Sequence, residues 1–218
     1  MWFNTYEHIT NKYSGFENFY PIFKRGIFLD TAPLFILICG NFDKKNRTHL
    51  IENFNANSSK KGEDRQYKLY DYNSLLAFLN SLDLNQIPLL VTPHIFTEFI
   101  KNLWEICETP KQFRNILETA LKPRTHIKDI EMCLSCNSFL CNEDLLNKKL
   151  EIGDISILIC AKEESKKKGA ITILTNDTSF AEISDKKHNF LTIFYNEIRT
   201  ATIQLGFNNI PKNFLEDI

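Results

Sequence analysis

Short apolar runs alternate with amphipathic stretches along the chain, and this alternation predicts strands and helices in turn. Continuous apolar runs, typical of strands buried on both faces, occupy residues 26–29, 88–91, 170–174 and 191–194. Apolar residues at helical spacing occupy residues 32–39, 71–79, 93–107, 111–121, 154–168 and 196–205, and a further helix is expected after Asp177. Strands that alternate with helices indicate parallel βαβ units. We therefore predict a three-layer α/β/α fold around a mainly parallel sheet of four or five strands.

Three regions stand outside this pattern. Residues 1–25 are rich in aromatic side chains and are interpreted as an N-terminal extension that packs on the protein's own core or docks a partner helix. Residues 41–69 are polar and lysine-rich, which predicts an insertion that forms a long surface excursion. Residues 123–150 support no assignment before a helix expected at 143–149. Without an internal repeat or a linker, residues 1–218 are expected to form a single domain.

Composition narrows the class of protein. Apolar residues make up 43% of the chain, which indicates a packed globular fold. The formal net charge of −1 gives no overall attraction to nucleic acid, so binding would depend on local basic clusters and on a metal. No apolar run approaches the length of a membrane span or a signal peptide, which favours a cytoplasmic protein without a membrane partner. The six cysteines are then expected to be reduced thiols.

Two other groups of residues have an ordinary and a functional interpretation. Cys133, Cys136 and Cys141, with His126 nearby, carry zinc-ligand side chains, but their irregular spacing favours ordinary thiols. Basic residues cluster at 44–47, 60–61, 122–124 and 166–168. Each cluster is interpreted as a solvated face, or as a contact to a nucleic-acid backbone if it flanks the active site.

Four acidic residues stand where apolar runs meet predicted helices: Asp30, Glu98, Asp154 and Asp177. Taken singly, the three aspartates suit helix N-caps and Glu98 suits a solvated helix face. Taken together, they belong to one edge of the sheet, because ligands of open parallel sheets bind outside the carboxyl ends of the strands. A cluster of carboxylates repels itself unless a cation joins it, and hard oxygen ligands suit Mg²⁺ or Mn²⁺. The sequence therefore predicts metal-dependent phosphodiester chemistry.

These residues also carry a family resemblance. The motifs are D-T-A from Asp30, T-E at Glu98, G-D-I-S-I-L-I-C-A around Asp154 and L-T-N-D ending at Asp177. Over residues 27–194 their order and spacing resemble the PIN domain nucleases. The resemblance implies that Asp30, Glu98, Asp154 and Asp177 bind Mg²⁺ or Mn²⁺, and that the Thr175 hydroxyl orients a neighbouring acid. It also implies an endonuclease that acts on RNA.

The family resemblance leaves the biological role open. One hypothesis is a toxin of the VapC type, whose partners would be a protein antitoxin and, in a homodimer, a second copy of the chain. A rival is a non-catalytic PIN-like module that binds RNA or protein, although such a scaffold has no need of four repelling carboxylates. A second rival, a metal-dependent phosphatase for small substrates, is disfavoured because the chain has no glycine-rich phosphate loop.

Overall fold

Five parallel strands form a single sheet at the centre of the molecule. The computed structural model describes residues 22–60, 66–81, 87–121, 127–129, 150–188 and 190–194. The strands are β1 (Ile27–Leu29), β2 (Leu89–Val91), β3 (Ile127–Asp129), β4 (Thr172–Thr175) and β5 (Leu191–Phe194). Their order across the sheet is β3-β2-β1-β4-β5, and every neighbouring pair is parallel. The predicted parallel α/β sheet is confirmed.

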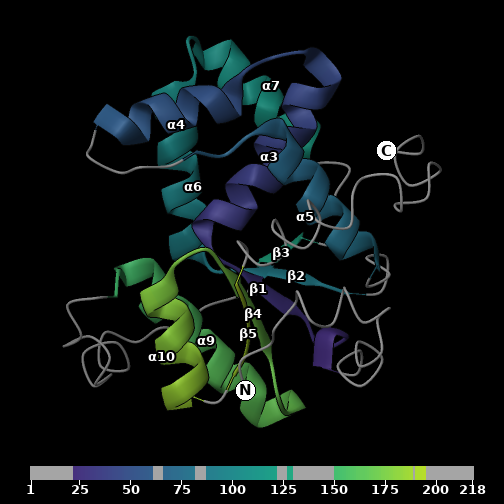
Figure 1. The fold of residues 1–218 in the computed structure, drawn as a ribbon, viewed down its shortest axis with the longest axis vertical. Helices are drawn as coiled ribbons and strands as arrows, with labels where there is room; N and C mark the ends of the chain where they lie inside the picture. Colours follow the sequence, from purple (N-terminus) through teal and green to yellow (C-terminus); the bar gives the residue numbers. More distant parts are fainter. Residues whose placement is uncertain are drawn as a thin grey trace.

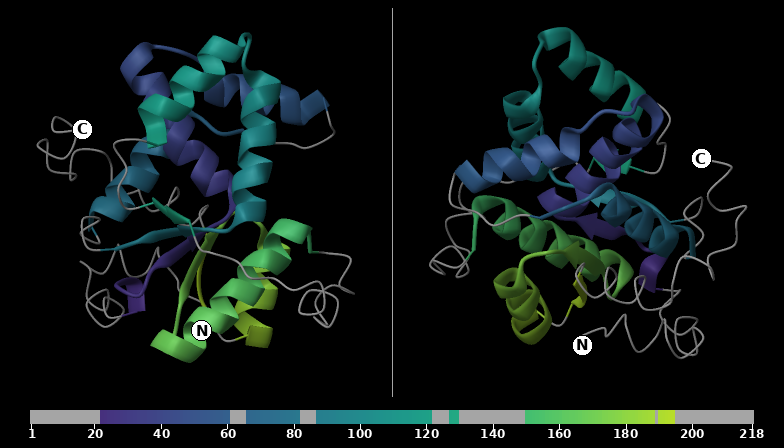
Figure 2. Two further views of the ribbon diagram at one scale, coloured as in Figure 1. Left: turned by 180° about the vertical axis from the view of Figure 1, so that it is seen from behind. Right: turned by 45° about the horizontal axis from the view of Figure 1, so that its top comes forward.

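Helices lie on both faces of this sheet. The described helices are α3 (Thr31–Asn46), α4 (Leu50–Lys60), α5 (Leu69–Ser81), α6 (Pro93–Ile106), α7 (Pro110–Leu121), α9 (Ile152–Lys168) and α10 (Thr178–His188). Figure 1 shows α9 and α10 on one side of the sheet, and α3 and α5 on the other. The turned views in Figure 2 show α4, α6 and α7 grouped on the α3 side. The arrangement is compatible with the predicted three layers.

The strand order reverses between β1 and β4, at the centre of the sheet. From β1 the chain reaches β2 and β3 on one side, then returns through α9 to β4 and β5 on the other. Leu29 is in register with Leu174, and just beyond them the Asp30 backbone N–H donates to the Leu174 carbonyl at 3.0 Å. In sheets of this kind, ligands bind in the crevice at such a reversal.

The core fixes the start of α3 against the sheet. All three residues of β1 are fully buried, as an apolar strand covered on both faces requires. The Phe35 ring of α3 stacks on Phe54 of α4 at 3.9 Å between centroids, and meets Phe99 of α6 edge-on at 6.0 Å. Because α3 is buried around most of its circumference, the residue that begins it has little freedom to move.

The prediction of a surface excursion over residues 41–69 is wrong for the described part. Helix α3 continues to residue 46, and α4 follows with Leu50, Ile51 and Phe54 buried. The Asp43 carboxylate explains this second helix, because it accepts the backbone N–H of Leu50 at 2.8 Å and of Ile51 at 3.0 Å. It thereby satisfies donors that a helix N-terminus otherwise leaves unpaired. A polar composition concealed a short amphipathic helix.

Strand β3 lies within residues 123–150, where the sequence supported no assignment. It pairs with β2, with Leu89 in register with Ile127. The helices expected at 143–149 and 196–205, residues 1–21 of the extension, and Cys133, Cys136 and Cys141 all lie outside the described residues. Within the described ranges, no helix combines the length and the apolar character needed to span a membrane.

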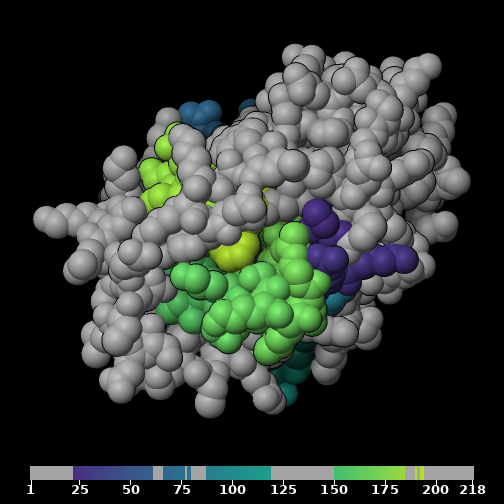
Figure 3. All heavy atoms as spheres, turned by 90° about the horizontal axis from the view of Figure 1, so that it is seen from below, coloured from purple at the N-terminus to yellow at the C-terminus, as the bar shows by residue number. Residues whose placement is uncertain are grey.

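The described chain begins beside the C-terminal end of α9. Figure 3 shows the purple first segment next to the green α9–β4 region. There the Arg25 guanidinium donates to the Ala170 carbonyl at 3.2 Å. Gly169 caps α9 with φ +83°, and a Cβ at this position would lie 2.6 Å from Arg25 Nη1. The positive φ favours a glycine here, whereas the Arg25 side chain could move away from a Cβ.

Candidate active site

Asp30 follows β1 and is the N-cap of α3. Its backbone is extended (φ −75°, ψ 166°), and Oδ1 accepts the Thr31 backbone N–H at 2.6 Å. Its second oxygen, Oδ2, accepts the Thr175 hydroxyl at 2.6 Å. Both oxygens are therefore held, one by the helix that Asp30 begins and one by the neighbouring strand β4.

Thr175 connects two of the predicted acids through one hydroxyl. It is fully buried at the end of β4, where its Oγ1 donates to Asp30 and accepts the Asp177 backbone N–H at 2.9 Å. Asp177 in turn caps α10, since its Oδ1 accepts the Phe180 N–H at 2.7 Å. The hydroxyl thus fixes the backbone of one acid and the side chain of another across the strand-order reversal.

Glu98 reaches the same edge from α6. Thr92 caps this helix and Pro93 begins it, so Glu98 lies in the second turn. The sequence had suggested the first turn. Its Oε2 accepts the Thr31 hydroxyl at 2.9 Å. A Cβ on Gly153 would lie 3.3 Å from the same oxygen, which shows how closely α9 approaches Glu98.

Asp154 lies in the first turn of α9 and is 6% exposed. The helix begins at Ile152, two residues before the predicted start, because Glu151 is its N-cap. Asp154 Oδ2 accepts the Glu151 backbone N–H at 2.9 Å, as the third helical residue does in a capping box. Asp30 and Asp177 therefore cap helices as predicted, whereas Asp154 is not an N-cap and supports the start of α9 from its third helical position.

The N-terminal ends of α6 and α9 are also joined directly. Thr92 Oγ1 lies 2.7 Å from Ser156 Oγ, and the Ser156 hydroxyl donates to the Gly153 carbonyl at 2.6 Å. Both hydroxyls are fully buried. This contact holds the N-terminal end of α6, one turn before Glu98, against the start of α9, which carries Asp154.

The acids are close enough to disturb each other's ionisation. Burial raises the pKa of Asp30 from 3.8 to about 6, assisted by the charges of Glu98 and Asp177 and opposed by its two hydrogen bonds. Burial raises the pKa of Asp154 to about 8, with the charge of Asp30 as the next largest cause and that of Asp177 contributing. Among the described residues, no lysine or arginine forms an ion pair with Asp30, Asp154 or Asp177.

The donor chemistry fits a hard divalent cation, whereas the arrangement of donors is not preformed. Carboxylate oxygens without a neighbouring cation are the ligands that Mg²⁺ and Mn²⁺ prefer. Yet within the described residues no three acidic, histidine or cysteine side chains are already gathered closely enough to hold an ion. Asp30 and Asp177 each accept a backbone N–H of the helix that they cap with one carboxylate oxygen. To bind an ion together, the carboxylates of the four acids would have to rotate toward one another.

A groove of about 470 Å³ opens between the N-terminal part of α6 and the start of α9 and is called the α6–α9 groove below. It is lined by Pro93, His94, Thr97, Glu98, Lys101, Glu151, Ile152 and Gly153. Glu98 belongs both to this groove and to the acidic cluster. The sequence identified Glu98 but treated its neighbours on the helix only as a solvated stripe, because the opposite wall comes from a distant segment.

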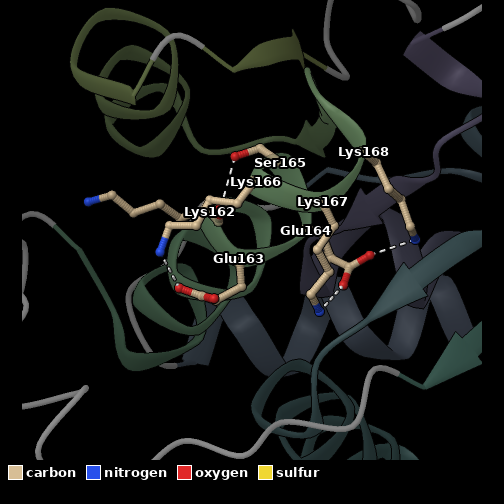
Figure 4. A network of polar contacts seen from close by, with 7 residues as sticks. All are labelled: Lys162, Glu163, Glu164, Ser165, Lys166, Lys167 and Lys168. Atoms are coloured by element: carbon tan, nitrogen blue, oxygen red, sulfur yellow. Dashed lines mark hydrogen bonds and ion pairs between the residues drawn. The ribbon is translucent and has the colours of Figure 1, made fainter.

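The predicted basic cluster at 166–168 lies away from the acids, and two glutamates neutralise it in part. As Figure 4 shows, glutamates of the same helix surround it. Lys166 pairs with Glu163 at 2.7 Å, while Lys167 and Lys168 pair with Glu164 at 3.0 and 2.6 Å. The cluster begins twelve residues after Asp154, or about 18 Å along the helix axis. It is a solvated helix face and not a flank of the site.

Comparison with protein-family models, curated proteins and solved structures finds no match to this chain. Membership of the PIN family therefore stays a prediction carried by the motifs. The function has to be inferred from the four acids, the hydroxyl that joins two of them, and the groove beside them.

Proposed function

We propose that this chain is a Mg²⁺- or Mn²⁺-dependent endonuclease that hydrolyses phosphodiester bonds in RNA. One observation carries the proposal: acids from four separate segments lie close enough at the carboxyl edge of a parallel sheet, where the strand order reverses, to influence one another's ionisation. The pKa values of Asp30 and Asp154 support it, because both are raised first by burial and then by neighbouring acids. These acids are Glu98 and Asp177 for Asp30, and chiefly Asp30 and Asp177 for Asp154. Perturbed ionisation of this kind is concentrated at functional sites.

Each residue has a distinct part in the proposed reaction. Asp30, Glu98, Asp154 and Asp177 would hold the cation, and Thr175 would position Asp30. A bound divalent ion would neutralise charge on the scissile phosphate and lower the pKa of the attacking water. Asp154 must lose its proton before it can act as a ligand, so activity is expected to rise with pH toward about 8 at limiting metal concentration.

RNA as substrate, and a role as a toxin, follow from the PIN resemblance alone. A toxin would arrest the growth of a bacterial host that expresses it, and Asp30→Asn should be harmless. A protein antitoxin and a homodimer belong to the same hypothesis. Normal growth of cells that contain soluble, RNA-cleaving protein would rule the toxin role out.

The second candidate is a non-catalytic module that binds RNA or protein. It is favoured by one observation, that no three potential ligands are gathered into a ready metal site among the described residues. Under this hypothesis the aspartates serve only as helix caps. Titration calorimetry with Mn²⁺ separates the candidates. A metal-dependent nuclease should bind Mn²⁺ in a way that Asp30→Asn abolishes, whereas the parent and Asp30→Asn forms of a non-catalytic module should give the same result.

Cleavage of a mixture of structured RNA and single-stranded DNA tests the proposed function directly. The purified chain is assayed with Mg²⁺, Mn²⁺ or EDTA, beside Asp30→Asn and Glu98→Gln. Glu105→Gln is the matched control, since it removes the same charge from α6 two turns away. We expect metal-dependent cleavage that is lost in the first two variants and kept in the control. Absence of cleavage by the folded protein under every condition would overturn the proposal.

A further inference from the structure

We propose that the α6–α9 groove binds a single-stranded nucleic acid, with Lys101 on a backbone phosphate and Trp104 stacked on one base. The link from this binding to cleavage rests on the proposed nuclease function. The binding itself is inferred from three features: the groove, the face of α6 beside it, and the exposed apolar side chains of Trp104 and Ile152.

The groove leads directly to the acidic cluster. Glu98 lines it, and the same Glu98 Oε2 accepts the Thr31 hydroxyl next to Asp30. Gly153 lies on the opposite wall, and a Cβ placed on it would be 3.3 Å from that oxygen. A chain molecule lying in the groove would therefore pass a phosphate to the edge where the acids meet.

One face of α6 presents both charge and an aromatic surface. His94, Lys101 and Trp104 lie at helix positions i, i+7 and i+10, within one side of the helix. The two carboxylates of the groove are Glu98, at the acidic cluster, and Glu151, on the α9 wall. Lys101 is the one lysine among the residues that line the groove, and its place on the α6 wall defines the side on which the phosphate backbone would run.

Trp104 is placed as a stacking platform. It is 55% exposed, although large aromatic side chains are usually buried. Its ring is steadied by an edge-to-face contact with Phe113, at 5.0 Å between centroids and 84° between planes. Trp104 lies six residues beyond Glu98, or about 9 Å along the helix axis. A stacked strand covers that distance in about three nucleotides.

The opposite wall also presents an apolar side chain. Ile152 is 58% exposed at the start of α9 and lines the groove. Trp104, beside the groove on α6, and Ile152, on its α9 wall, are exposed apolar side chains that suit bases, which have apolar faces, better than they suit a double helix. In a duplex the base faces are already stacked and cannot reach Trp104, so the site selects single strands.

Fluorescence provides the direct test, because the chain has only two tryptophans. Trp2→Phe leaves Trp104 as the only emitter. In EDTA, where nothing is cleaved, a single-stranded oligouridine should quench this emission, and a duplex of equal length should not. Unchanged emission, or equal quenching by the duplex, would overturn the inference.

Matched variants measured by anisotropy of a labelled oligouridine complete the test. Trp104→Ala should weaken binding by about fivefold to a hundredfold, the effect of losing one stacked base. Lys101→Ala should reduce the slope of log K against log salt by about 0.7, which corresponds to one phosphate contact on a single strand. Lys162→Ala, an exposed lysine farther along α9, should change neither quantity. Circular dichroism checks that each variant is folded.

The outcomes separate this inference from the proposed nuclease function. If the parent cleaves RNA while Trp104→Ala and Lys101→Ala bind and cleave as the parent does, the groove assignment is wrong and the nuclease stands. If strand binding depends on Trp104 and Lys101 but no metal supports cleavage, the groove assignment is correct and the nuclease proposal fails.

Discussion

Replacing Asp154 by Asn should stabilise the metal-free protein at pH 8, although it alters a helix cap. The carboxyl is 6% exposed, and its pKa is raised from 3.8 to about 8, first by burial and then by the charge of Asp30. Its ionised form is therefore unfavourable in the folded state. Asn removes the charge and keeps an oxygen that can accept the Glu151 N–H, which Asp154 now accepts at 2.9 Å.

The sign and the size of the effect follow from proton linkage. Between pH 3.8 and about 8 the folded state holds a proton on Asp154 that the unfolded state has released. The free energy of unfolding therefore falls as pH rises through this window. At about 1.4 kcal/mol per pKa unit, the upper limit of the loss is roughly 6 kcal/mol. Because a buried amide also has a desolvation cost, we expect Asn to recover about 2 kcal/mol at pH 8.

Thermal unfolding at pH 4, 6 and 8 in EDTA measures this effect. A gain of about 2 kcal/mol corresponds to a Tm increase of about 4 to 8 °C for a chain of this size. The gain should vanish near pH 4, and Mn²⁺ should raise the Tm of the parent but not of Asp154→Asn. Glu163→Gln, which removes an exposed charge from the same helix, should leave the change in stability between pH 6 and 8 as it is in the parent. A variant less stable than the parent by the same amount at every pH would refute the reasoning and make Asp154 a cap alone.

Three further substitutions test individual contacts. Thr175→Val removes the hydroxyl and leaves the Asp30 carboxylate and the Asp177 N–H without this partner, so it should lower the free energy of unfolding in chemical denaturation by about 1 to 3 kcal/mol and reduce cleavage. Thr175→Ser, which restores a hydroxyl, should recover both. Gly153→Ala should slow cleavage while the folded protein is kept, since its Cβ would lie 2.9 Å from Ile95 Cδ1 and 3.3 Å from the Glu98 carboxylate. Cleavage and thermal unfolding of the same sample measure the two effects. Asp43→Ala should lower stability by about 1 to 3 kcal/mol through loss of the α4 cap while cleavage by the folded fraction is kept.

The strands of the sheet were largely predictable because apolar runs buried on both faces are visible in one dimension. Strands β1, β2, β4 and β5 fall within one or two residues of the predicted runs. Strand β3 was not predicted, because Ile127–Asp129 contains only one apolar residue, and its pairing with β2 establishes it as a strand. Helix α4 was missed for a similar reason: its N-terminus is capped by Asp43, which belongs to the preceding helix.

The candidate site was predicted in its residues but not in its connections. Asp30 and Asp177 could be placed at one edge because both follow parallel strands. The family resemblance implied that Thr175 orients a neighbouring acid, but not that one hydroxyl would contact both Asp30 and Asp177. The sequence also did not show that the N-terminal ends of α6 and α9 would be tied by Thr92 and Ser156. Contacts of this kind depend on how segments far apart in the chain pack, and no local pattern encodes them.

The hydrogen bond between Thr175 and Asp30 has a consequence for biosynthesis. Its partners are 145 residues apart in the chain, and β1 and β4 lie side by side only after everything between them has been made. A nascent chain that ends before β4 carries Asp30 and Glu98 but lacks Thr175 and Asp177. Contacts of such long range also form late and slowly in folding. A chain that ends before Asp177 therefore has no complete acidic cluster, and any activity of the cluster can appear only after β4 and Asp177 have been made.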